Sequence, residues 1–317
     1  MKDRVSFNIK NNRINFKFQI ERNVTIISGD SGTGKTKLFN MVRNYELYGK
    51  KDSGITLNCK KNCITLVDKE DWFGKLSLTI DSIVFIDEAS EFLRTQEFAK
   101  AIQESDNYYV IITREALPQI PYSIDSIKEI IKNGATPELK KTYSNVSLKD
   151  ITKYNYDVLI TEDSEAGYQL FEIVAGKVQA SCIPAGGKTR LLNILKKQKN
   201  KRALVVADAA ALGSEIHELV KYKELHEGYV EFFLPESFEW LILKSGIISN
   251  DGIKAILKDP IKYIDSKDFF SWERYFTELL VEETATMPGL EYSKKRLAKG
   301  YSSDANVDKI VGAMKKK

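Results

Sequence analysis

The sequence predicts an α/β protein of two domains, each built around a mainly parallel sheet. Its 317 residues exceed the length of a typical single domain. Short β-branched runs alternate with segments of helical character, and this alternation occurs twice along the chain. Between about residues 133 and 156 it gives way to polar and glycine-containing sequence. We therefore expect domains at 1–145 and 155–317, the second ending in a helical part.

The first half of the chain begins with two segments in which every second residue is apolar. This period predicts antiparallel strands at Val5–Ile9 and Ile14–Ile20. Buried strands and helices then alternate, as they do in a parallel sheet. The strands are expected at Val24–Ser28, Ser82–Ile86 and Tyr108–Thr113, and the helices at Lys35–Tyr45 and near Ser90–Glu104.

A second alternation of strands and helices fills the other half. Strands are expected at Val158–Thr161, Val178–Ile183, Ala203–Ala207 and Val230–Leu234, and helices at Glu165–Val174, Thr189–Lys197 and about Ser214–Lys221. From Glu236 onward the sequence is mostly helical in character. Its core contacts are expected from Trp240, Trp272, Tyr275 and Phe276, and the last residues, through Lys317, are expected to fray.

Composition favours a soluble protein with packed cores. Hydrophobic residues make up 43% of the chain and charged residues 29%. The 48 basic residues nearly balance the 44 acidic ones, so net charge alone does not indicate a nucleic-acid binder, although local basic patches are compatible with it. No long apolar run follows Met1. We therefore expect no signal peptide or membrane span, and a cytoplasmic location.

The three cysteines fit a reducing compartment. Cys59 and Cys63 flank a predicted turn, with short strands expected at Ile55–Cys59 and Cys63–Val67. A zinc site would need two more ligands nearby, and histidine occurs only at 217 and 226. Cysteines on the two sides of a hairpin turn are the preferred interpretation.

The segment Gly29-Asp30-Ser31-Gly32-Thr33-Gly34-Lys35-Thr36 matches the pattern GxxxxGK[ST] in full, after a predicted strand and before a predicted helix. Its glycines allow successive backbone N–H groups to surround phosphate oxygens, and the helix N-terminus adds a positive dipole. Lys35 is expected to reach the β- and γ-phosphates of ATP, and the Thr36 hydroxyl to bind Mg²⁺. The alternative is a glycine-rich turn at a helix start.

Acidic and polar residues follow the next two predicted strands. Asp87 is placed to hold Mg²⁺ through water, and Glu88 to act as the general base for the attacking water. An acidic helix start is the alternative for this pair. Thr113 is a candidate γ-phosphate sensor, and Arg114 could stabilise charge in its own site or a neighbour's. Both could also be strand-end residues that face solvent.

Residues 5–130, with these two motifs, resemble the heads of ABC-type P-loop ATPases. The resemblance implies ATP as ligand and a homodimer or larger homo-oligomer that closes around it. No LSGGQ-like signature is present, since Leu76-Ser77-Leu78-Thr79 is not one. We expect ATP binding at the loop and hydrolysis with the help of Asp87 and Glu88.

Residues 157–240 resemble a Toprim domain, the metal-dependent module of topoisomerases, primases and overcoming-lysogenization-defect (OLD) nucleases. The matching features are Glu162 after the first strand, Gly186-Gly187-Lys188 after the second, Asp208 after the third and Glu236 after the fourth. The resemblance implies that Glu162 moves protons and binds metal, and that Asp208 anchors Mg²⁺ or Mn²⁺.

The chain departs from the Toprim pattern at two positions. Ala210 stands where the family has its second metal-binding aspartate, and Asp163 where it usually has glycine. Glu165 or Glu215 could replace the lost ligand. Alternatively, the domain is a Toprim-like scaffold that no longer cuts, or an ordinary α/β domain with acidic strand ends.

Gly187-Lys188-Thr189 does not form a second phosphate loop, because Cys182 occupies the position of the leading glycine. Lys188 and Arg190 are candidates for a nucleic-acid phosphate, or are solvated charges at a helix start. His217 and His226 have no spaced partner.

An ABC-like ATPase followed by a Toprim domain is the order of the OLD nucleases, which are associated with phage defence. The chain looks like a compact relative. We therefore expect an ATP-regulated protein that processes DNA or RNA. The alternative is a nucleotide-dependent sensor or scaffold with a degenerate Toprim-like domain.

Overall fold

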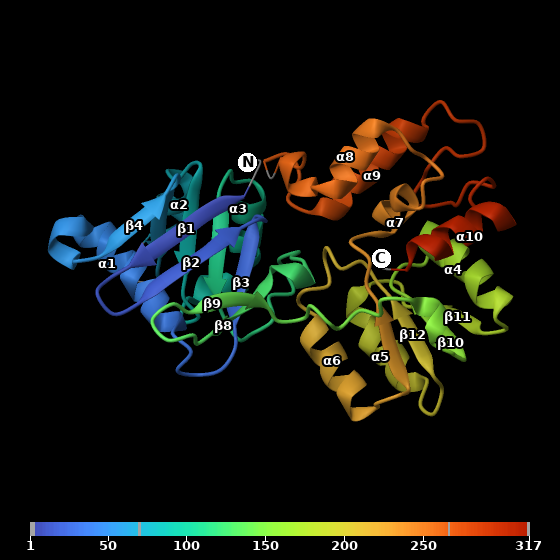
Figure 1. Cartoon of the computed structure of the whole chain (residues 1–317), viewed down its shortest axis with the longest axis horizontal. Helices are drawn as coiled ribbons and strands as arrows, with labels where there is room; N and C mark the ends of the chain where they lie inside the picture. Colours follow the sequence, from blue (N-terminus) through green and yellow to red (C-terminus); the bar gives the residue numbers. More distant parts are fainter. Residues whose placement is uncertain (1–3, 69–70, 266, 316–317) are drawn as a thin grey trace. The chain divides into compact units, whose positions relative to one another are not determined.

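The computed structural model describes residues 4–68, 71–265 and 267–315. The chain divides into two compact units, one made of residues 1–143 and 259–270 and the other of residues 144–258 and 271–317. Each unit contains its own parallel strands, which confirms the predicted α/β class (Figure 1). The predicted domain limits, 1–145 and 155–317, stay a prediction.

The first unit contains an antiparallel sheet in the order β2-β1-β4 and a six-stranded sheet in the order β5-β6-β7-β3-β8-β9. All neighbours in the larger sheet are parallel except β8 and β9. The strands are β1 (Val5–Lys10), β2 (Asn15–Ile20), β3 (Val24–Ser28), β4 (Thr56–Cys59), β5 (Asn62–Leu66), β6 (Ser82–Ile86), β7 (Tyr108–Ile112), β8 (Ile127–Ile131) and β9 (Glu138–Lys141). The helices are α1 (Lys35–Ser53), α2 (Trp72–Ser77) and α3 (Gln96–Gln103), with short 3₁₀ turns at Glu91–Arg94 and Ile124–Ser126.

One hydrophobic core joins the two sheets of this unit. The alternating residues of β1 and β2 that the sequence marks as apolar, such as Phe7 and Phe16, are fully buried there. Leu38 and Val42 of α1 and Phe85 of β6 belong to the same core. Helix α1 is therefore fixed between the antiparallel strands and the parallel sheet.

Two predictions for this unit are wrong. The segments around the cysteines do form strands, but β4 pairs with β1 and β5 pairs with β6, so no hairpin forms. Only two residues separate β4 from β5, and each strand completes a different sheet. The helix expected near 90–104 is split into the 3₁₀ turn Glu91–Arg94 and α3, because Thr95 has an extended backbone and caps α3 through its hydroxyl.

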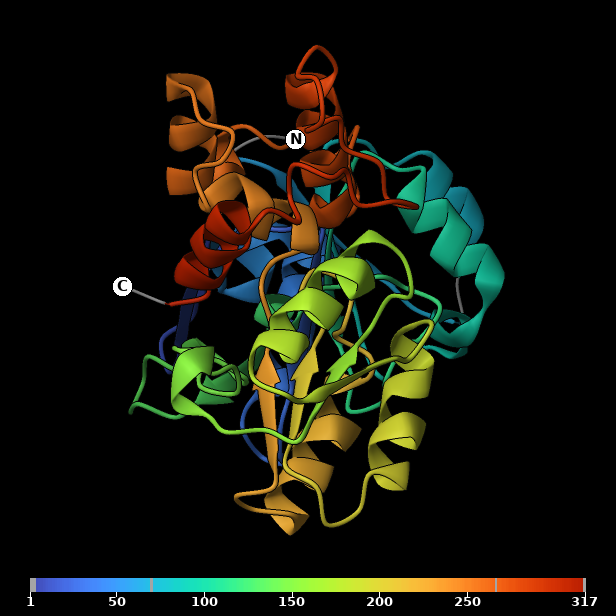
Figure 2. The same cartoon turned by 90° about the vertical axis from the view of Figure 1, so that its right-hand side faces the viewer.

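The second unit has a four-stranded parallel sheet in the order β11-β10-β12-β13 (Figure 2). Its strands are β10 (Val158–Thr161), β11 (Ser181–Pro184), β12 (Ala203–Val206) and β13 (Val230–Phe233). Its helices are α4 (Ala166–Lys177), α5 (Leu191–Lys197), α6 (Ile216–Leu225), α7 (Phe238–Lys244), α8 (Asp251–Lys258), α9 (Trp272–Thr284) and α10 (Asp304–Ala313), with 3₁₀ turns at Ile151–Lys153 and Lys188–Arg190; a further 3₁₀ turn, Pro260–Lys262, lies in the first unit.

The predicted helical C-terminal part is confirmed. The four aromatic residues expected in its core are buried to different extents. Phe276 is fully buried, whereas Trp240, Trp272 and Tyr275 are half-buried. The expected fraying falls mostly on residues outside the described range. Among the described residues, none of the helices is both long and apolar enough to cross a membrane.

Candidate functional site

In the first unit, three predicted site segments leave the parallel sheet at one edge. Ile27 of β3 pairs with Ile112 of β7, and the neighbouring Ile111 pairs with Ile86 of β6. The phosphate-loop segment, Thr113 and Asp87 each follow one of these strands. Parallel strands present their carboxyl ends at a common edge, where α/β sheets hold ligands.

The segment 29–36 forms a loop whose backbone carbonyl groups accept hydrogen bonds from its own lysine, Lys35. Gly29, Gly32 and Gly34 have φ angles of +106°, +78° and +111°, a region that side chains with Cβ rarely adopt. Lys35 is buried, and its Nζ donates to the carbonyl oxygens of Gly29 and Asp30 at 2.6 Å each. A cation is thus held inside a ring of backbone at the start of α1, where the helix dipole is also positive.

Burial lowers the pKa of the Lys35 ammonium, and Arg114 lowers it further, while Glu88 and Asp30 oppose this. Glu88 and Arg114 are therefore electrostatic neighbours of the loop. Their side chains approach each other, with Arg114 Nε 3.8 Å from Glu88 Oε2. Both are about half exposed, so they remain free to reorient around a ligand.

Asp87 carries an unsatisfied polar atom. Its Oδ1 is buried without a hydrogen-bond partner among the described residues. Burial raises the pKa of this carboxyl. A carboxylate oxygen left without a donor in such a place suits a hydrated cation, because leaving it unpaired is costly. Thr36, the other predicted Mg²⁺ ligand, is exposed at the start of α1.

The Thr113 side chain is buried and already engaged. Its hydroxyl accepts a hydrogen bond from the Glu115 N–H at 3.0 Å. The backbone N–H of Thr113 donates to Ile27 of the adjacent β3. Thr113 is thus held at the strand end beside the loop, with its hydroxyl fixed by the following turn.

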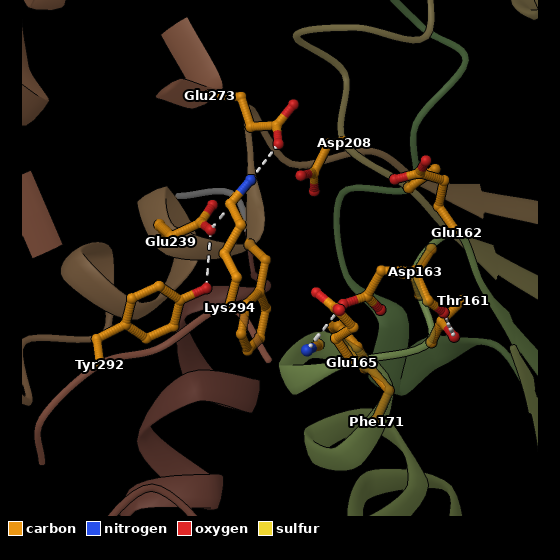
Figure 3. A pocket seen from close by; sticks show the side chains of 14 residues that line it. Thr161, Glu162, Asp163, Glu165, Phe171, Asp208, Glu239, Glu273, Tyr292 and Lys294 are labelled. Carbon is orange, nitrogen blue, oxygen red and sulfur yellow. Dashed lines mark hydrogen bonds and ion pairs between the residues drawn. The ribbon is translucent and has the colours of Figure 1, made fainter. Parts of the chain in front are cut away.

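In the second unit, a cavity of about 210 Å³ lies at the carboxyl edge of the sheet (Figure 3). Glu162 follows β10 and Asp208 follows β12, and both line it, as predicted from their strand-end positions. Six carboxyl groups and one ammonium share its wall. These charged residues are Glu162, Asp163, Glu165, Asp208, Glu239, Glu273 and Lys294.

The pKa of Glu162 is raised to about 7, first by burial and then by the nearby Glu273 and Asp163. A hydrogen bond from the Lys188 backbone N–H opposes this rise, so the glycine-rich turn after β11 does contact Glu162. The pKa of Asp208 is raised strongly, again by burial first and then by neighbouring carboxylates, with Lys294 acting in the opposite direction. Crowded acidic groups of this kind favour protonation or a bound cation.

Four ionisable residues of the cavity were not predicted from the sequence: Glu239, Glu273, Tyr292 and Lys294. Lys294 Nζ donates to Glu273 Oε1 at 2.5 Å and lies 3.8 Å from Glu239 Oε1. The Tyr292 hydroxyl donates to the same Glu239 oxygen at 2.7 Å, which leaves Glu239 Oε2 buried without a partner among the described residues. These residues come from the helical C-terminal part, where no spacing pattern marks them.

One of the two departures from the Toprim pattern, Asp163, has a local structural role. The Asp163 carboxylate accepts a hydrogen bond from the Gly167 N–H at 3.1 Å, so it caps the start of α4. Gly167 has no room for a Cβ, which would lie 2.9 Å from Asp163 Oδ2. Ala210 is buried.

The two candidate replacement ligands differ in position. Glu165 lines the cavity. Glu215 does not: its carboxylate accepts from the Ser214 hydroxyl at 2.6 Å and lies 3.5 Å from Lys188 Nζ. Lys188 also donates to Ala211 O at 2.8 Å, so it is occupied within the chain, whereas Arg190 is exposed.

Within 4–68, 71–265 and 267–315, no group of three or more His, Cys, Asp or Glu side chains is arranged to hold a metal ion. The acidic groups of the cavity therefore share one space without converging on a point. A cation would have to draw them together.

Comparison with models of known protein families found no match, and comparison with curated proteins found none. The residues and their geometry therefore carry the functional argument.

Proposed function

We propose that the first unit is an ABC-like P-loop ATPase that binds ATP with Mg²⁺. The observation that carries this proposal is the loop 29–36, which holds the buried Lys35 ammonium on two backbone carbonyls between a parallel strand and a helix. Triphosphate oxygens would replace those carbonyls as partners of Lys35, while loop N–H groups surround the phosphates.

The residues around the loop have separate roles in this proposal. Thr36 and Asp87 would hold Mg²⁺, and the unpaired Asp87 oxygen supports this. The bound ion would neutralise charge on the phosphates. Glu88 would orient the attacking water, and Thr113 would contact the γ-phosphate. The Arg114 side chain, 3.8 Å from Glu88, would reorient toward the phosphates.

For the second unit we propose a Toprim-like, metal-dependent site that processes DNA or RNA, as in a compact OLD-family nuclease. Support comes from Glu162 and Asp208 at one sheet edge, within a cavity that holds six carboxyl groups. Such a surplus of acidic groups suits Mg²⁺ or Mn²⁺. Glu162, with its raised pKa, would hold or release a proton near neutral pH. By resemblance, nucleotide state would control this site, the protein would act as a homo-oligomer, and its role would be phage defence.

A specific observation favours a second function, that of a nucleotide-dependent sensor or scaffold. The carboxyl groups do not form a ready metal site among the described residues, and Lys294 already bonds to Glu273. With Ala210 in place of a ligand, the second unit would then bind a partner and cut nothing.

One experiment separates the two functions. Purified protein is incubated with single- and double-stranded DNA and RNA, with Mg²⁺ or Mn²⁺, with and without ATP. The nuclease proposal expects cleavage that Glu162→Ala abolishes and that Glu224→Ala, an exposed glutamate of α6, leaves intact. Absence of cleavage under every condition, with ATP binding retained, supports the scaffold.

A further inference from the structure

One short segment late in the sequence belongs to the first unit, although most residues of the second unit precede it. Residues 259–270, which we call the return segment, belong to the first unit, although the residues on both sides belong to the second. The segment starts directly after α8 and ends directly before Ser271 and α9. It is thus covalently tied to second-unit helices at both ends.

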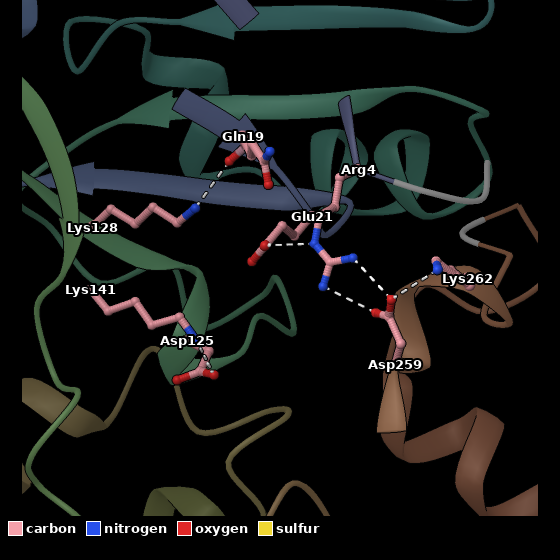
Figure 4. Close-up of polar contacts among 8 residues, drawn as sticks. All are labelled: Arg4, Gln19, Glu21, Asp125, Lys128, Lys141, Asp259 and Lys262. Atoms are coloured by element: carbon pink, nitrogen blue, oxygen red, sulfur yellow. Dashed lines mark hydrogen bonds and ion pairs between the residues drawn. The ribbon is translucent and has the colours of Figure 1, made fainter. Parts of the chain in front are cut away.

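An ion-pair cluster anchors the start of the return segment (Figure 4). Arg4, directly before β1, donates from Nη1 to Asp259 Oδ2 at 3.2 Å, and its Nη2 lies 3.0 Å from Asp259 Oδ1. The Arg4 Nε donates to Glu21 Oε1 at 3.3 Å, which orients the guanidinium. Two apolar residues of the segment, Ile261 and Ile264, are buried with 8% and 4% of their surface exposed. The segment is therefore held by a two-pronged charge contact and by burial.

The anchor is connected to the nucleotide loop by packed structure. Val5, next to Arg4, lies in the same core as Leu38 and Val42 of α1. Helix α1 begins at Lys35, within the loop proposed to hold the phosphates. A change in the position of α1 would therefore act on β1 and, through Arg4, on the return segment.

The far end of the return segment leads to the second-unit cavity. Glu273, in the first turn of α9, accepts a hydrogen bond from Lys294 and lines the cavity with Glu162 and Asp208. Glu273 lies only three positions after the end of the segment at Phe270. Such a stretch spans about 10 Å at most, so little slack is available to absorb a displacement.

We propose that Arg4 and Asp259 form a positioning pair that couples the nucleotide loop to the placement of Glu273 and Lys294 in the second-unit cavity. The inference rests on the proposed nucleotide site and names the route by which it would regulate the second unit. It does not require that the cavity cleaves nucleic acid. Spatial continuity alone does not establish coupling, so the test is a charge-reversal cycle.

The measurement is amide hydrogen exchange followed by mass spectrometry, with and without a non-hydrolysable ATP analogue and Mg²⁺. Nucleotide binding by each protein is measured separately by calorimetry. In the wild-type chain we expect the analogue to change exchange in the return segment and in the first turns of α9. Asp259→Asn should lower protection of the return segment about fivefold, the effect of losing a partly exposed ion pair. Arg4→Glu should lower it further, because it brings like charges together.

In both single variants the analogue should still bind, but its effect on α9 should be largely lost. The double variant Arg4→Glu/Asp259→Arg should restore that effect in part, since Glu21 and Lys262 then lie beside like charges. A role of either residue alone would predict no recovery. Lys141→Ala is the matched control, because it removes another exposed ion pair of the same unit, with Asp125 at 2.6 Å. It should leave the nucleotide effect on α9 unchanged.

Two outcomes would overturn the proposal and are distinguishable. If the wild-type chain does not bind the analogue, the nucleotide site itself is wrong and the coupling falls with it. If the analogue binds but exchange in α9 does not change, or if both single variants keep the full change, only the coupling is wrong. Asp259→Asn, which is nearly isosteric, keeps the test valid if Arg4→Glu fails to fold.

Discussion

Replacing Glu162 with glutamine should make the second unit more stable at pH 8 but not at pH 4. Glu162 is partly buried beside Glu273 and Asp163, and its pKa is raised from 4.5 to about 7. Between these values the folded chain binds a proton that the unfolded chain releases. The stabilising contribution of the protonated form is therefore complete below pH 4.5 and is lost as the pH rises through 7. Glutamine keeps the shape of the protonated form at every pH.

The size of the stability difference follows from the pKa shift of Glu162. A rise of the pKa from 4.5 to about 7 corresponds to about 3 kcal/mol in the free energy of unfolding, as an upper limit. Partial solvent access of this carboxyl group reduces it, so we expect about 2 kcal/mol at pH 8. At pH 4, below the unfolded pKa, the variant and the wild type should agree within about 0.5 kcal/mol.

The assay must report on the second unit alone, because a chain of two units need not unfold in one step. Hydrogen exchange of amides in β10 and β12 across a urea series provides the free energy of opening of that unit. Glu165→Gln is the control. It lines the same cavity but is exposed, and should change stability little at either pH. An equal effect of Glu162→Gln at both pH values, or a wild type more stable than the variant at pH 8, would contradict this account of the site.

Three further expectations concern single positions. Lys35→Ala should weaken ATP binding at least about tenfold, because one charge-assisted contact to phosphate is lost, whereas the exposed Lys37→Ala should not; calorimetry measures both. Gly34→Ala should destabilise the first unit by about 1–2 kcal/mol because its φ is +111°, while Gly176→Ala, at a helical position with open space for a Cβ, should be neutral or stabilising in thermal unfolding. Ser237→Ala should cost about 1 kcal/mol in denaturant unfolding, because the buried hydroxyl caps α7.

Much of the fold could be predicted from local patterns. The alternation in β1 and β2 and the apolar runs in β3, β6 and β7 reflect which faces of the strands are buried, and consecutive residues reveal this pattern. Consecutive residues do not reveal which strands pair with each other. β4 and β5 are separated by a two-residue bend that resembles a hairpin in sequence, yet long-range packing assigns them to different sheets. β9 was hidden in polar sequence because it is an exposed edge strand.

The candidate sites divide in the same way. The phosphate-loop residues are consecutive, so a spacing pattern detects them, and Glu162 and Asp208 follow strands that end at a common edge. Glu273 and Lys294 reach the cavity from a helix and a loop far along the chain, and only the tertiary fold brings them there. Their ion pair has no signature in the sequence.

The return segment also has a consequence for biosynthesis. Residues 1–143 leave the ribosome well before Ile261 and Ile264, which are buried in the completed molecule, have been made. The first unit therefore cannot finish folding in the order of synthesis, as domains generally do. Its contacts with 259–270 span more than two hundred residues of chain, and closing a loop of that length is slow. A nascent chain that pauses before residue 259 would therefore carry an incomplete first unit.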